Sequence, residues 1–405
     1  MKVAIIGAGF TGLSAAIDLV EARWEVTIFE AEKRPGGLAV GFLASGWDWS
    51  LERFYHHIFA NDKAVIDLAA KVGRPAFFQT PKTNSLINGE QKQLDSPLSL
   101  LLFSDVSFFS RLRMGLGLLI LKIIGNGLFL ERWRVVDFMP GLVGEEGYEK
   151  IWKPLLAAKF GPYLPQVNMA WFWARIYKRT QSLGYFPGGF GALAEKMADY
   201  VTTRGGKVKL GKKVKSMKRD KKAGWWVNNE KFDKVLITTP TLVAVPKIDY
   251  LWAQTLVLEL EASLMKGYWL NVLEKDWPFL VAVEHTNFID KNHYGGKTII
   301  YLGNYLADGD KRLELSEEKL LELFLPFLSK INPSFKPSWV KRSWCFEAPF
   351  AQPVFGVNYS QKLPGIKTAL PDLFIANMSQ VYPWDRGTNY AVELGQQAAK
   401  LIKND

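Results

Sequence analysis

Three glycines near the N-terminus have the spacing of a dinucleotide-binding turn. They follow the apolar run 3–6 and precede a helix-period pattern over 13–21. Such glycines allow a tight turn, a close approach of the backbone to a pyrophosphate, and close packing of helix on strand. The free N–H groups and the dipole at the start of the helix then stabilise phosphate charge. We expect the diphosphate contacts to come from Gly7, Ala8, Gly9, Phe10, Thr11 and Gly12.

An acidic residue completes this unit. A second apolar strand is predicted over 25–29, and Glu30 follows it directly. At that position a carboxylate accepts hydrogen bonds from an adenosine ribose and repels a 2′-phosphate. Because strand, glycine turn, helix, second strand and acid occur in order, the segment 1–30 predicts a Rossmann-type βαβ unit.

A second glycine turn with a cation follows at 31–38. Together with the first unit, Arg34, Gly36 and Gly37 resemble the fingerprint of the flavoprotein superfamily that contains amine oxidases, protoporphyrinogen oxidase and phytoene-desaturase-like enzymes. The resemblance implies FAD as the cofactor, with this stretch lying along the pyrophosphate and ribitol. The implied contacts are Ala31, Arg34, Gly36, Gly37 and Leu38.

The C-terminal part of the chain extends the resemblance. A last strand over 372–377 and a final helix beginning at 386–391 look like the family's closing flavin motif, whose helix N-terminus faces the pyrimidine edge of the flavin. The family's usual glycine after the strand is Asn377 here. The implied contacts are Asn377, Arg386, Gly387, Thr388 and Asn389. An ordinary surface helix is the alternative for this segment.

A third matching stretch, 185–190, marks the return to the cofactor domain in relatives, and by analogy the backbone of Val214 contacts the adenine. The expected fold is α/β: a Rossmann-type FAD-binding domain with a parallel sheet and an inserted mixed α+β substrate domain. The FAD-binding domain is assigned to 1–75, 183–245 and 365–405. The substrate domain is assigned to 76–182, which looks helical, and 246–364, with strand-like runs at 255–260 and 297–302.

Two histidines are candidates for chemistry beside the flavin, because flavin reactions often need one group that manages a proton. His56 and His57 come shortly after the second glycine turn, and His57 is the first catalytic candidate while His56 is a candidate substrate contact. Residues 57–62 also resemble the histidine segment of UDP-galactopyranose mutase, a non-redox flavoenzyme. That segment's second histidine is Ala60 here, and a packed core histidine is the alternative reading of both positions.

His285 is the second catalytic candidate, and its neighbours Glu284 and Asn287 are candidate substrate contacts within an apolar, strand-like region. Hydrogen-bonded residues at a sheet edge are the alternative. Tyr382 and Trp384 precede the final helix and are candidates for a pocket wall over the flavin, with core packing as the alternative.

These features favour an FAD-dependent oxidoreductase that transfers hydride from a largely apolar organic substrate to flavin N5. Amine oxidation is disfavoured, because residues 251–258 lack the lysine that amine oxidases place in the corresponding strand. A mutase acting on a nucleotide sugar is the alternative. A membrane-surface or partner-binding protein that keeps FAD as a structural ligand is a third hypothesis.

Composition limits the remaining classes. The 405 residues are 48% apolar and carry a formal net charge of +11, enough for a large core and more than one domain. A single cysteine, Cys345, and four histidines predict neither a disulfide framework nor a metal site. The basic block 207–222 alternates as a solvated strand pair does, so no nucleic-acid partner is expected.

The segment 98–133 is apolar and basic, but charges interrupt it before the roughly 20 residues of a membrane-spanning helix. It is a candidate for peripheral membrane contact and for the entry of a lipidic substrate, with helices covering a core as the alternative. No secretion signal is visible, so we expect a cytoplasmic protein, potentially peripheral at the inner face of the membrane. The sequence does not indicate an oligomeric state.

Overall fold

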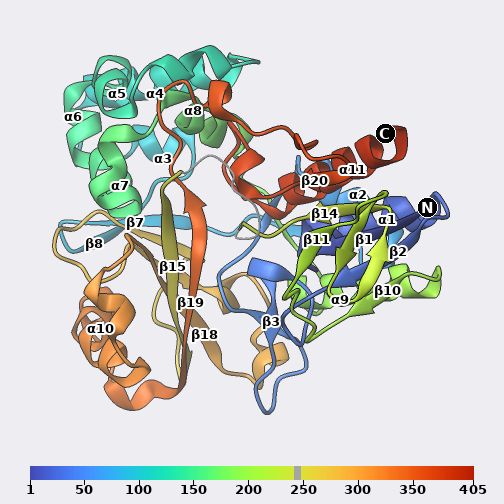
Figure 1. The fold of residues 1–405 in the computed structure, drawn as a ribbon. Coiled ribbons are helices and arrows are strands. Elements are labelled where there is room, and N and C mark those ends of the chain that lie inside the picture. The colour runs from blue at the N-terminus through green and yellow to red at the C-terminus, as the bar shows by residue number, and fades with distance from the viewer. Residues whose placement is uncertain (241–247) are drawn as a thin grey trace.

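A computed structural model describes residues 1–240 and 248–405. Its first sheet is parallel throughout and has the order β10-β2-β1-β14-β20 (Figure 1). Its strands are β10 (Lys207–Lys209), β2 (Glu25–Phe29), β1 (Lys2–Ile6), β14 (Lys234–Ile237) and β20 (Leu373–Ile375). The predicted Rossmann-type sheet is confirmed.

Both faces of this sheet are covered. Val3 and Ile5 of β1 pack in the same core as three helices, α1 (Phe10–Glu21), α9 (Gly189–Thr203) and α11 (Thr388–Asn404), and α2 (Lys63–Lys71) packs on α11. Ala4 and Ile6 face the opposite side and contact a small antiparallel sheet. That sheet consists of β11 (Met217–Arg219), β12 (Trp225–Val227) and β13 (Glu230–Phe232). The alternation of side chains along β1 therefore divides the core into two layers.

The basic block 207–222 does not form a strand pair, so that prediction is wrong. β10 joins the edge of the parallel sheet beside β2, whereas β11 pairs with β12 in the small sheet. The alternating pattern indicates that each strand has one exposed face, but it does not indicate which strand pairs with β10 or with β11.

The inserted part of the chain contains a seven-stranded mixed sheet with the order β19-β15-β18-β17-β16-β7-β8. Its strands are β19 (Val340–Pro353), β15 (Tyr250–Leu260), β18 (Thr298–Leu306), β17 (Val281–Glu284), β16 (Trp269–Val272), β7 (Thr83–Ile87) and β8 (Glu90–Gln93). The strands predicted at 255–260 and 297–302 are confirmed as parts of β15 and β18. One face is covered by α10 (Glu317–Ile331), which packs on β15 and β19.

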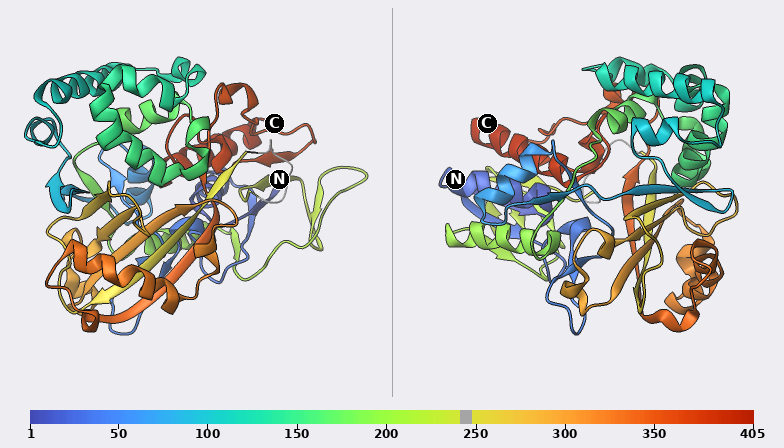
Figure 2. Two further views of the ribbon diagram at one scale, coloured as in Figure 1. Left: turned by 90° about the vertical axis from the view of Figure 1, so that its left-hand side faces the viewer. Right: turned by 180° about the vertical axis from the view of Figure 1, so that it is seen from behind.

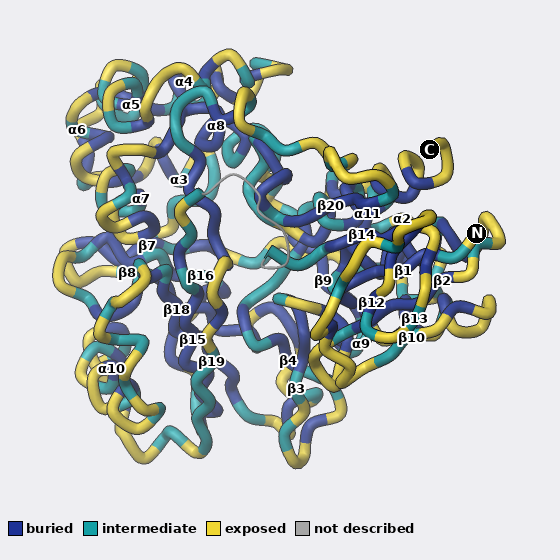
Figure 3. Tube along the Cα trace, viewed as in Figure 1, coloured by how far each residue is buried: buried dark blue, intermediate teal, exposed yellow. Residues whose placement is uncertain are grey.

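A helical layer lies over one end of this sheet (Figure 2). Its helices are α3 (Pro97–Leu101), α4 (Phe108–Ile123), α5 (Val135–Val143), α6 (Glu145–Gly147), α7 (Lys153–Phe160) and α8 (Met169–Lys178). The Asn168 side chain caps α8 by accepting from the Trp171 N–H at 3.0 Å. Trp171 and Trp173 are buried in the layer's core. Much of α8 is buried (Figure 3). Within the described ranges, no helix has the length and apolar character to cross a bilayer.

Short strands connect the two parts, namely β3 (Gly41–Phe42), β4 (Leu51–Glu52), β5 (Ile58–Phe59), β6 (Phe77–Gln79) and β9 (Leu183–Tyr185). The parallel sheet takes its strands from 1–75, 183–245 and 365–405, and the seven-stranded sheet from 76–182 and 246–364. The segment 76–182 is helical apart from β6, β7 and β8. The predicted boundary between 245 and 246 lies outside the described residues.

One close helix contact generates a stability prediction. A Cβ on Gly395 of α11 would lie 2.3 Å from the Thr11 carbonyl oxygen of α1, so Gly395→Ala should destabilise the fold by about 1–3 kcal/mol. Urea unfolding of FAD-free protein measures the change. Gly141→Ala in α5 is the matched control, because its Cβ would meet nothing within 4 Å. Equal unfolding free energies for both variants would contradict this prediction.

Candidate functional site

The glycine turn after β1 leaves no room for side chains. Gly7 has a φ of +109°, and a Cβ on Gly12 would lie 2.1 Å from the Gly7 carbonyl oxygen. The turn leads into α1, whose N-cap is Gly9. No side chain caps this helix and its first turn holds no acidic residue. Its first N–H groups are therefore available to a ligand oxyanion, as a diphosphate site requires.

The second glycine turn packs against the first. The Gly36 N–H donates to the Ala8 carbonyl at 2.9 Å, and a Cβ on Gly37 would lie 3.2 Å from the Gly9 Cα. Gly36 and Gly37 both have positive φ, +130° and +59°. Two segments predicted to follow one cofactor thus lie side by side at the carboxyl end of β1. Of their neighbours, Ala31 and Arg34 are exposed, and Leu38 is half-buried against the cluster of Phe54 and Ala253.

Backbone amides orient the Glu30 carboxylate. One oxygen accepts from the Ala8 N–H at 2.7 Å and the other from the Glu32 N–H at 2.9 Å. These bonds hold the carboxylate at the tip of β2, beside the glycine turn, where its remaining lone pairs can accept from ribose hydroxyls. Val214 is buried in the core layer that contains Phe29 and the small antiparallel sheet.

The N-terminus of α11 forms the other half of the crevice. Gly387 is its N-cap, no side chain caps it, and no acidic residue occupies its first turn, in which Thr388 is buried. Asn389 does not face a ligand with its amide, because its Oδ1 accepts from the Val65 N–H and its Nδ2 donates to Glu393. A helix start with free N–H groups suits the electron-rich pyrimidine edge of a flavin.

Asn377 stands where the family resemblance implies a glycine, and the backbone accommodates it. Its φ of −139° is ordinary for a residue with a side chain. Its Oδ1 accepts from the N–H and hydroxyl of Ser379, and its own N–H donates to Gln380. The Asn377 carbonyl accepts from the Gln380 N–H at 3.0 Å, so the side chain and the backbone of Asn377 are both engaged in a short turn.

His56 and His57 are half-buried and differ in their partners. The Nδ1 of His56 lies 2.6 Å from the Phe54 carbonyl. The Nδ1 of His57 lies 3.3 Å from the Tyr268 hydroxyl, and its ring packs edge-on against Phe59 and Trp269. Burial lowers the pKa of His56 to about 4 and, with nearby Arg179, that of His57 to about 3. Both imidazoles are neutral at pH 7.

His285 lies in the core. Its Nε2 lies 2.8 Å from the Tyr294 hydroxyl, and its ring packs against Tyr185 and Tyr301. Burial lowers its pKa to about 3. This enclosure favours packing over proton transfer to a ligand.

Glu284 and Asn287 hold one loop in place. The Glu284 carboxylate accepts from the N–H groups of Leu264 and Met265 at 2.9 Å and from the Ser263 hydroxyl at 2.6 Å. The Asn287 amide donates to the carbonyls of Met265 and Gly267. Their polar atoms are satisfied within the protein, which favours the alternative of hydrogen-bonded sheet residues.

Tyr382 and Trp384 lie between the helical layer and α11. The Tyr382 hydroxyl donates to Glu131 at 2.8 Å and accepts from Asn168 at 3.0 Å. The Trp384 ring is half-buried and parallel to that of Tyr390, with centroids 5.6 Å apart, and it also packs against Trp173. Trp384 and Tyr390 together present an aromatic surface at the start of α11, and Nζ of Lys178 lies 5.0 Å from the Trp384 ring centroid and 6.0 Å from that of Tyr390.

The structure adds a cluster that the sequence did not indicate. The Asp385 carboxylate lies 2.6 Å from Nη1 of Arg175 and 3.5 Å from Nζ of Lys159, and it accepts from the Trp171 indole at 3.2 Å. Its neighbour Arg386 donates to the Ala351 carbonyl at 2.9 Å and lies over the Tyr305 ring. Arg175 and Asp385 each lie in an aromatic segment of the sequence. This was the only sequence feature that could have indicated their pairing, because the two residues are 210 positions apart.

Glu52 is a second residue that the sequence did not indicate. It is fully buried in β4, where its carboxylate accepts from the Tyr185 hydroxyl and the Phe190 N–H, each at 2.6 Å. Burial raises its pKa to about 7. Glu52 joins the aromatic cluster around Tyr185 to the return strand β9 and thereby supports the loop that carries His56 and His57.

Comparisons with known proteins agree with this geometry. The sequence pattern of the flavin containing amine oxidoreductase family matches residues 10–403. A probable zeta-carotene desaturase of Synechococcus elongatus is 39% identical over 100 residues, 24% of this chain and 20% of that protein. Hydroxysqualene dehydroxylase of Sinorhizobium fredii is 33% identical over 72 residues, 18% of this chain and 17% of that protein. The matched stretches thus span a fifth or less of these relatives.

Solved structures share the whole fold. A putative protoporphyrinogen oxidase from Exiguobacterium sp. 255-15 has a TM-score of 0.77 at 17% identity, covering 100% of this chain and 98% of that one. Reduced UDP-galactopyranose mutase has a TM-score of 0.75 at 16% identity, covering 100% and 95%. Putrescine oxidase bound to putrescine has a TM-score of 0.73 at 15% identity, covering 100% of both chains.

The parallel sheet, the paired glycine turns and the two open helix starts define an FAD-dependent oxidoreductase class of flavoprotein, and FAD is the cofactor. More particularly, the chain belongs to the flavin containing amine oxidoreductase family. The residues present fit the group, because the two glycine turns pack closely at Gly9 and Gly37 and no side chain of the described residues caps the start of α1 or α11.

The orientation of Glu30 generates a prediction for cofactor binding. Glu30→Gln should weaken FAD binding about tenfold, because an amide group would face an N–H donor of Ala8 or Glu32. Fluorescence titration of apoprotein with FAD measures the affinity. The exposed Glu32→Gln, which removes the same charge, is the matched control. Equal FAD affinities for the two variants would contradict the placement of Glu30 in the ribose site.

Proposed function

We propose that this chain oxidises a largely apolar organic substrate by hydride transfer to FAD. The observation that carries the proposal is the aromatic surface of Trp384 and Tyr390, which is half-buried at the start of the helix that faces the flavin edge. Planar apolar walls bind hydrocarbon and leave little space for water. The two curated relatives are named for zeta-carotene and hydroxysqualene, which supports an apolar substrate class.

Bound FAD supplies a hydride acceptor at flavin N5. In this proposal Glu30 and the start of α1 fix the adenosine diphosphate, and the start of α11 favours the charge that arrives on reduction. His57, which is neutral at pH 7, positions the substrate by a hydrogen bond from its free ring nitrogen. The aromatic side chains around it, Tyr268 and Trp269, exclude water. His285 has a packing role in this account.

The alternative is a non-redox flavoenzyme of the UDP-galactopyranose mutase type that acts on a nucleotide sugar. The resemblance of residues 57–62 motivates it. The two proposals differ in whether the oxidised or the reduced flavin responds to the substrate.

A substrate panel separates these functions. Oxidised FAD-loaded protein is mixed anaerobically with hydroxysqualene, zeta-carotene in detergent, and putrescine. We expect an apolar compound to bleach the flavin absorbance at a rate that Trp384→Ala lowers at least tenfold, because the variant removes the wall. Leu370→Ala, at an exposed position, is the control.

Bleaching by putrescine alone would replace the proposal with amine oxidation. A spectral response of only the reduced protein, and only to UDP-galactopyranose, would establish the mutase alternative. A flavin that no donor reduces would leave FAD as a structural ligand.

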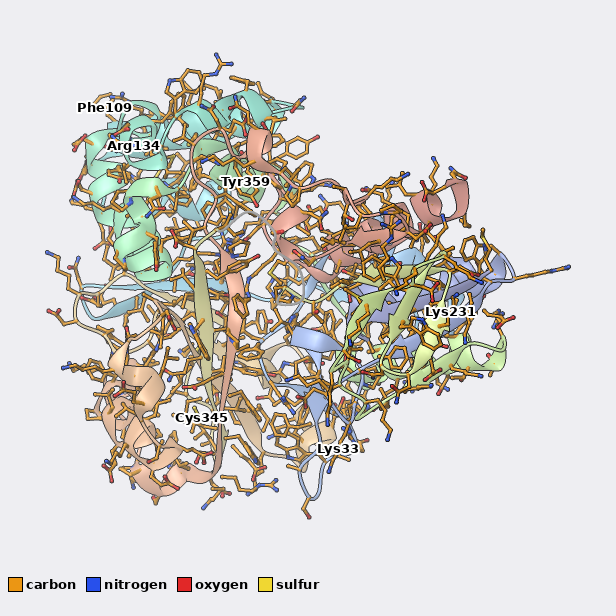
Figure 4. The ribbon with its side chains drawn as sticks, viewed as in Figure 1. Lys33, Phe109, Arg134, Lys231, Cys345 and Tyr359 are labelled. Carbon is orange, nitrogen blue, oxygen red and sulfur yellow. The ribbon has the colours of Figure 1, made fainter. Side chains whose placement is uncertain are left out.

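We further propose that the segment 98–133 contacts an anionic membrane surface. Among the described residues, 21 large apolar residues have exposed side chains, and 12 of these lie in this segment. The most exposed of the 12 are Phe109 (82%), Leu102 (72%) and Ile123 (72%). Phe109 and Arg134 both lie on the helical layer (Figure 4). Over 98–133 there are four basic residues and two acidic ones, so charge and apolar surface favour the same partner.

Sedimentation with vesicles tests this contact. The double variant Phe109→Glu and Leu116→Glu should lower binding to phosphatidylcholine–phosphatidylglycerol vesicles at least tenfold, because exposed phenylalanine and leucine side chains each gain about 1.5–3 kcal/mol on burial. Leu370→Glu, exposed in another part of the molecule, should bind as the unchanged protein does. Unchanged protein that stays in the supernatant would rule the contact out.

A further inference from the structure

Two cationic side chains from separate parts of the chain converge on one carboxylate, and a third cation lies close to them. Lys159 comes from α7, Arg175 from α8, and Arg386 from the segment before α11. Asp385, next to Arg386 in the chain, lies 2.6 Å from Arg175 and 3.5 Å from Lys159. The cluster lies where the helical layer meets the start of α11, beside the proposed aromatic wall.

The Asp385 carboxylate is fully engaged. One oxygen accepts from the Trp171 indole and from the Arg386 backbone N–H, both at 3.2 Å, and the other carries the contacts to Arg175 and Lys159. Among the described residues, no second carboxylate lies within 4.0 Å of these cations. Lys159 and Arg175 therefore share one carboxylate, and the Arg386 side chain has no carboxylate within 4.0 Å among the described residues.

The other neighbours of these cations are aromatic rings and a backbone carbonyl. Nζ of Lys159 lies 5.0 Å from the ring centroid of Trp171 and 5.2 Å from that of Tyr305, and the Arg386 guanidinium lies 4.6 Å above Tyr305. Ring faces attract cations weakly compared with an anion in the same place. Taking unbalanced positive charge out of water is costly, so an additional anion would stabilise the cluster.

The cationic neighbours contribute to the pKa shifts within the cluster. Burial lowers the pKa of Lys159 to about 7, with Arg175 and Arg386 adding to the effect against the opposing charge of Asp385. Burial and the charge of Arg175 likewise lower the pKa of Arg386 to about 10. An anion at this place would reverse these shifts.

The cluster is also reachable. The side chain of Arg175 is 37% exposed and that of Asp385 21%, whereas that of Lys159 is 11% exposed. Arg175 uses Nη1 for Asp385, which leaves its other donors for a bidentate contact to a carboxylate or phosphate.

We propose that Lys159, Arg175 and Arg386 bind an anionic oxygen group, a carboxylate or a phosphate, at one end of the otherwise apolar substrate. This inference rests on the proposed function, since it adds a polar anchor to the same apolar site. It selects amphiphilic acids over neutral hydrocarbons and amines, and it fixes which end of the molecule lies away from the aromatic wall.

Calorimetry of the FAD-loaded protein with octyl phosphate, octanoate and octanol tests the proposal. We expect octyl phosphate or octanoate to bind at least tenfold more tightly than octanol and to weaken with added salt. The comparison of the two acids distinguishes phosphate from carboxylate. Inorganic phosphate without an alkyl chain should compete with the preferred acid for the same site.

Variants locate the binding. Arg175→Met and Lys159→Met should each weaken binding of the preferred acid at least tenfold and leave octanol binding unchanged. Lys153→Met is the matched control, because this exposed lysine lies on the same helix and pairs with Glu149. Arg175→Lys keeps the charge beside Asp385 and should retain part of the affinity, which covers the case in which Arg175→Met does not fold.

Equal binding of octanol and both acids would overturn the inference. So would variants that shift the flavin reduction potential while acid binding stays the same, because the cations would then serve the reduced flavin. Calorimetry does not require flavin reduction. A flavin that no substrate reduces would therefore defeat the proposed function and leave acid selectivity as a separate result.

Discussion

The close approach of two backbone segments in the glycine turn controls the geometry of the cofactor domain. The Gly7 carbonyl oxygen lies 2.1 Å from where a Cβ of residue 12 would stand, so α1 can pack directly on β1. The same tight packing recurs where Gly395 of α11 meets the Thr11 carbonyl of α1. Because β1 and β20 are parallel within one sheet, the two helices that follow them begin at the same edge, which is where we propose that the cofactor binds.

The cofactor end of this crevice was predictable from the sequence because its determinants are local. Gly7, Gly9, Gly12 and Glu30 lie within one βαβ unit, and their roles follow from the backbone conformation that they permit. The parallel sheet and two strands of the inserted sheet were likewise readable from apolar runs. The partners of the basic strands β10 and β11 were not, since an exposed face does not encode which strand lies beside it.

The proposed substrate end could not be predicted from the sequence, because its groups are distant in the chain. Asp385 and Arg175 are separated by 210 positions, and neither has a spacing pattern that indicates the other. The sequence did select His285, Glu284 and Asn287 as polar residues in an apolar region, and the structure satisfies their polar atoms within the protein. A buried polar residue in a sequence thus indicates a hydrogen-bond partner, and only the fold shows whether that partner is protein or ligand.

A crystal structure of the FAD-loaded protein tests the central claim of a crevice between two helix starts most directly. The account predicts the diphosphate at the N–H groups of residues 10–12, the ribose hydroxyls on Glu30, and the flavin ring between the start of α11 and the loop that carries His57. A diphosphate bound elsewhere, or a flavin ring directed away from α11 into solvent, would contradict it.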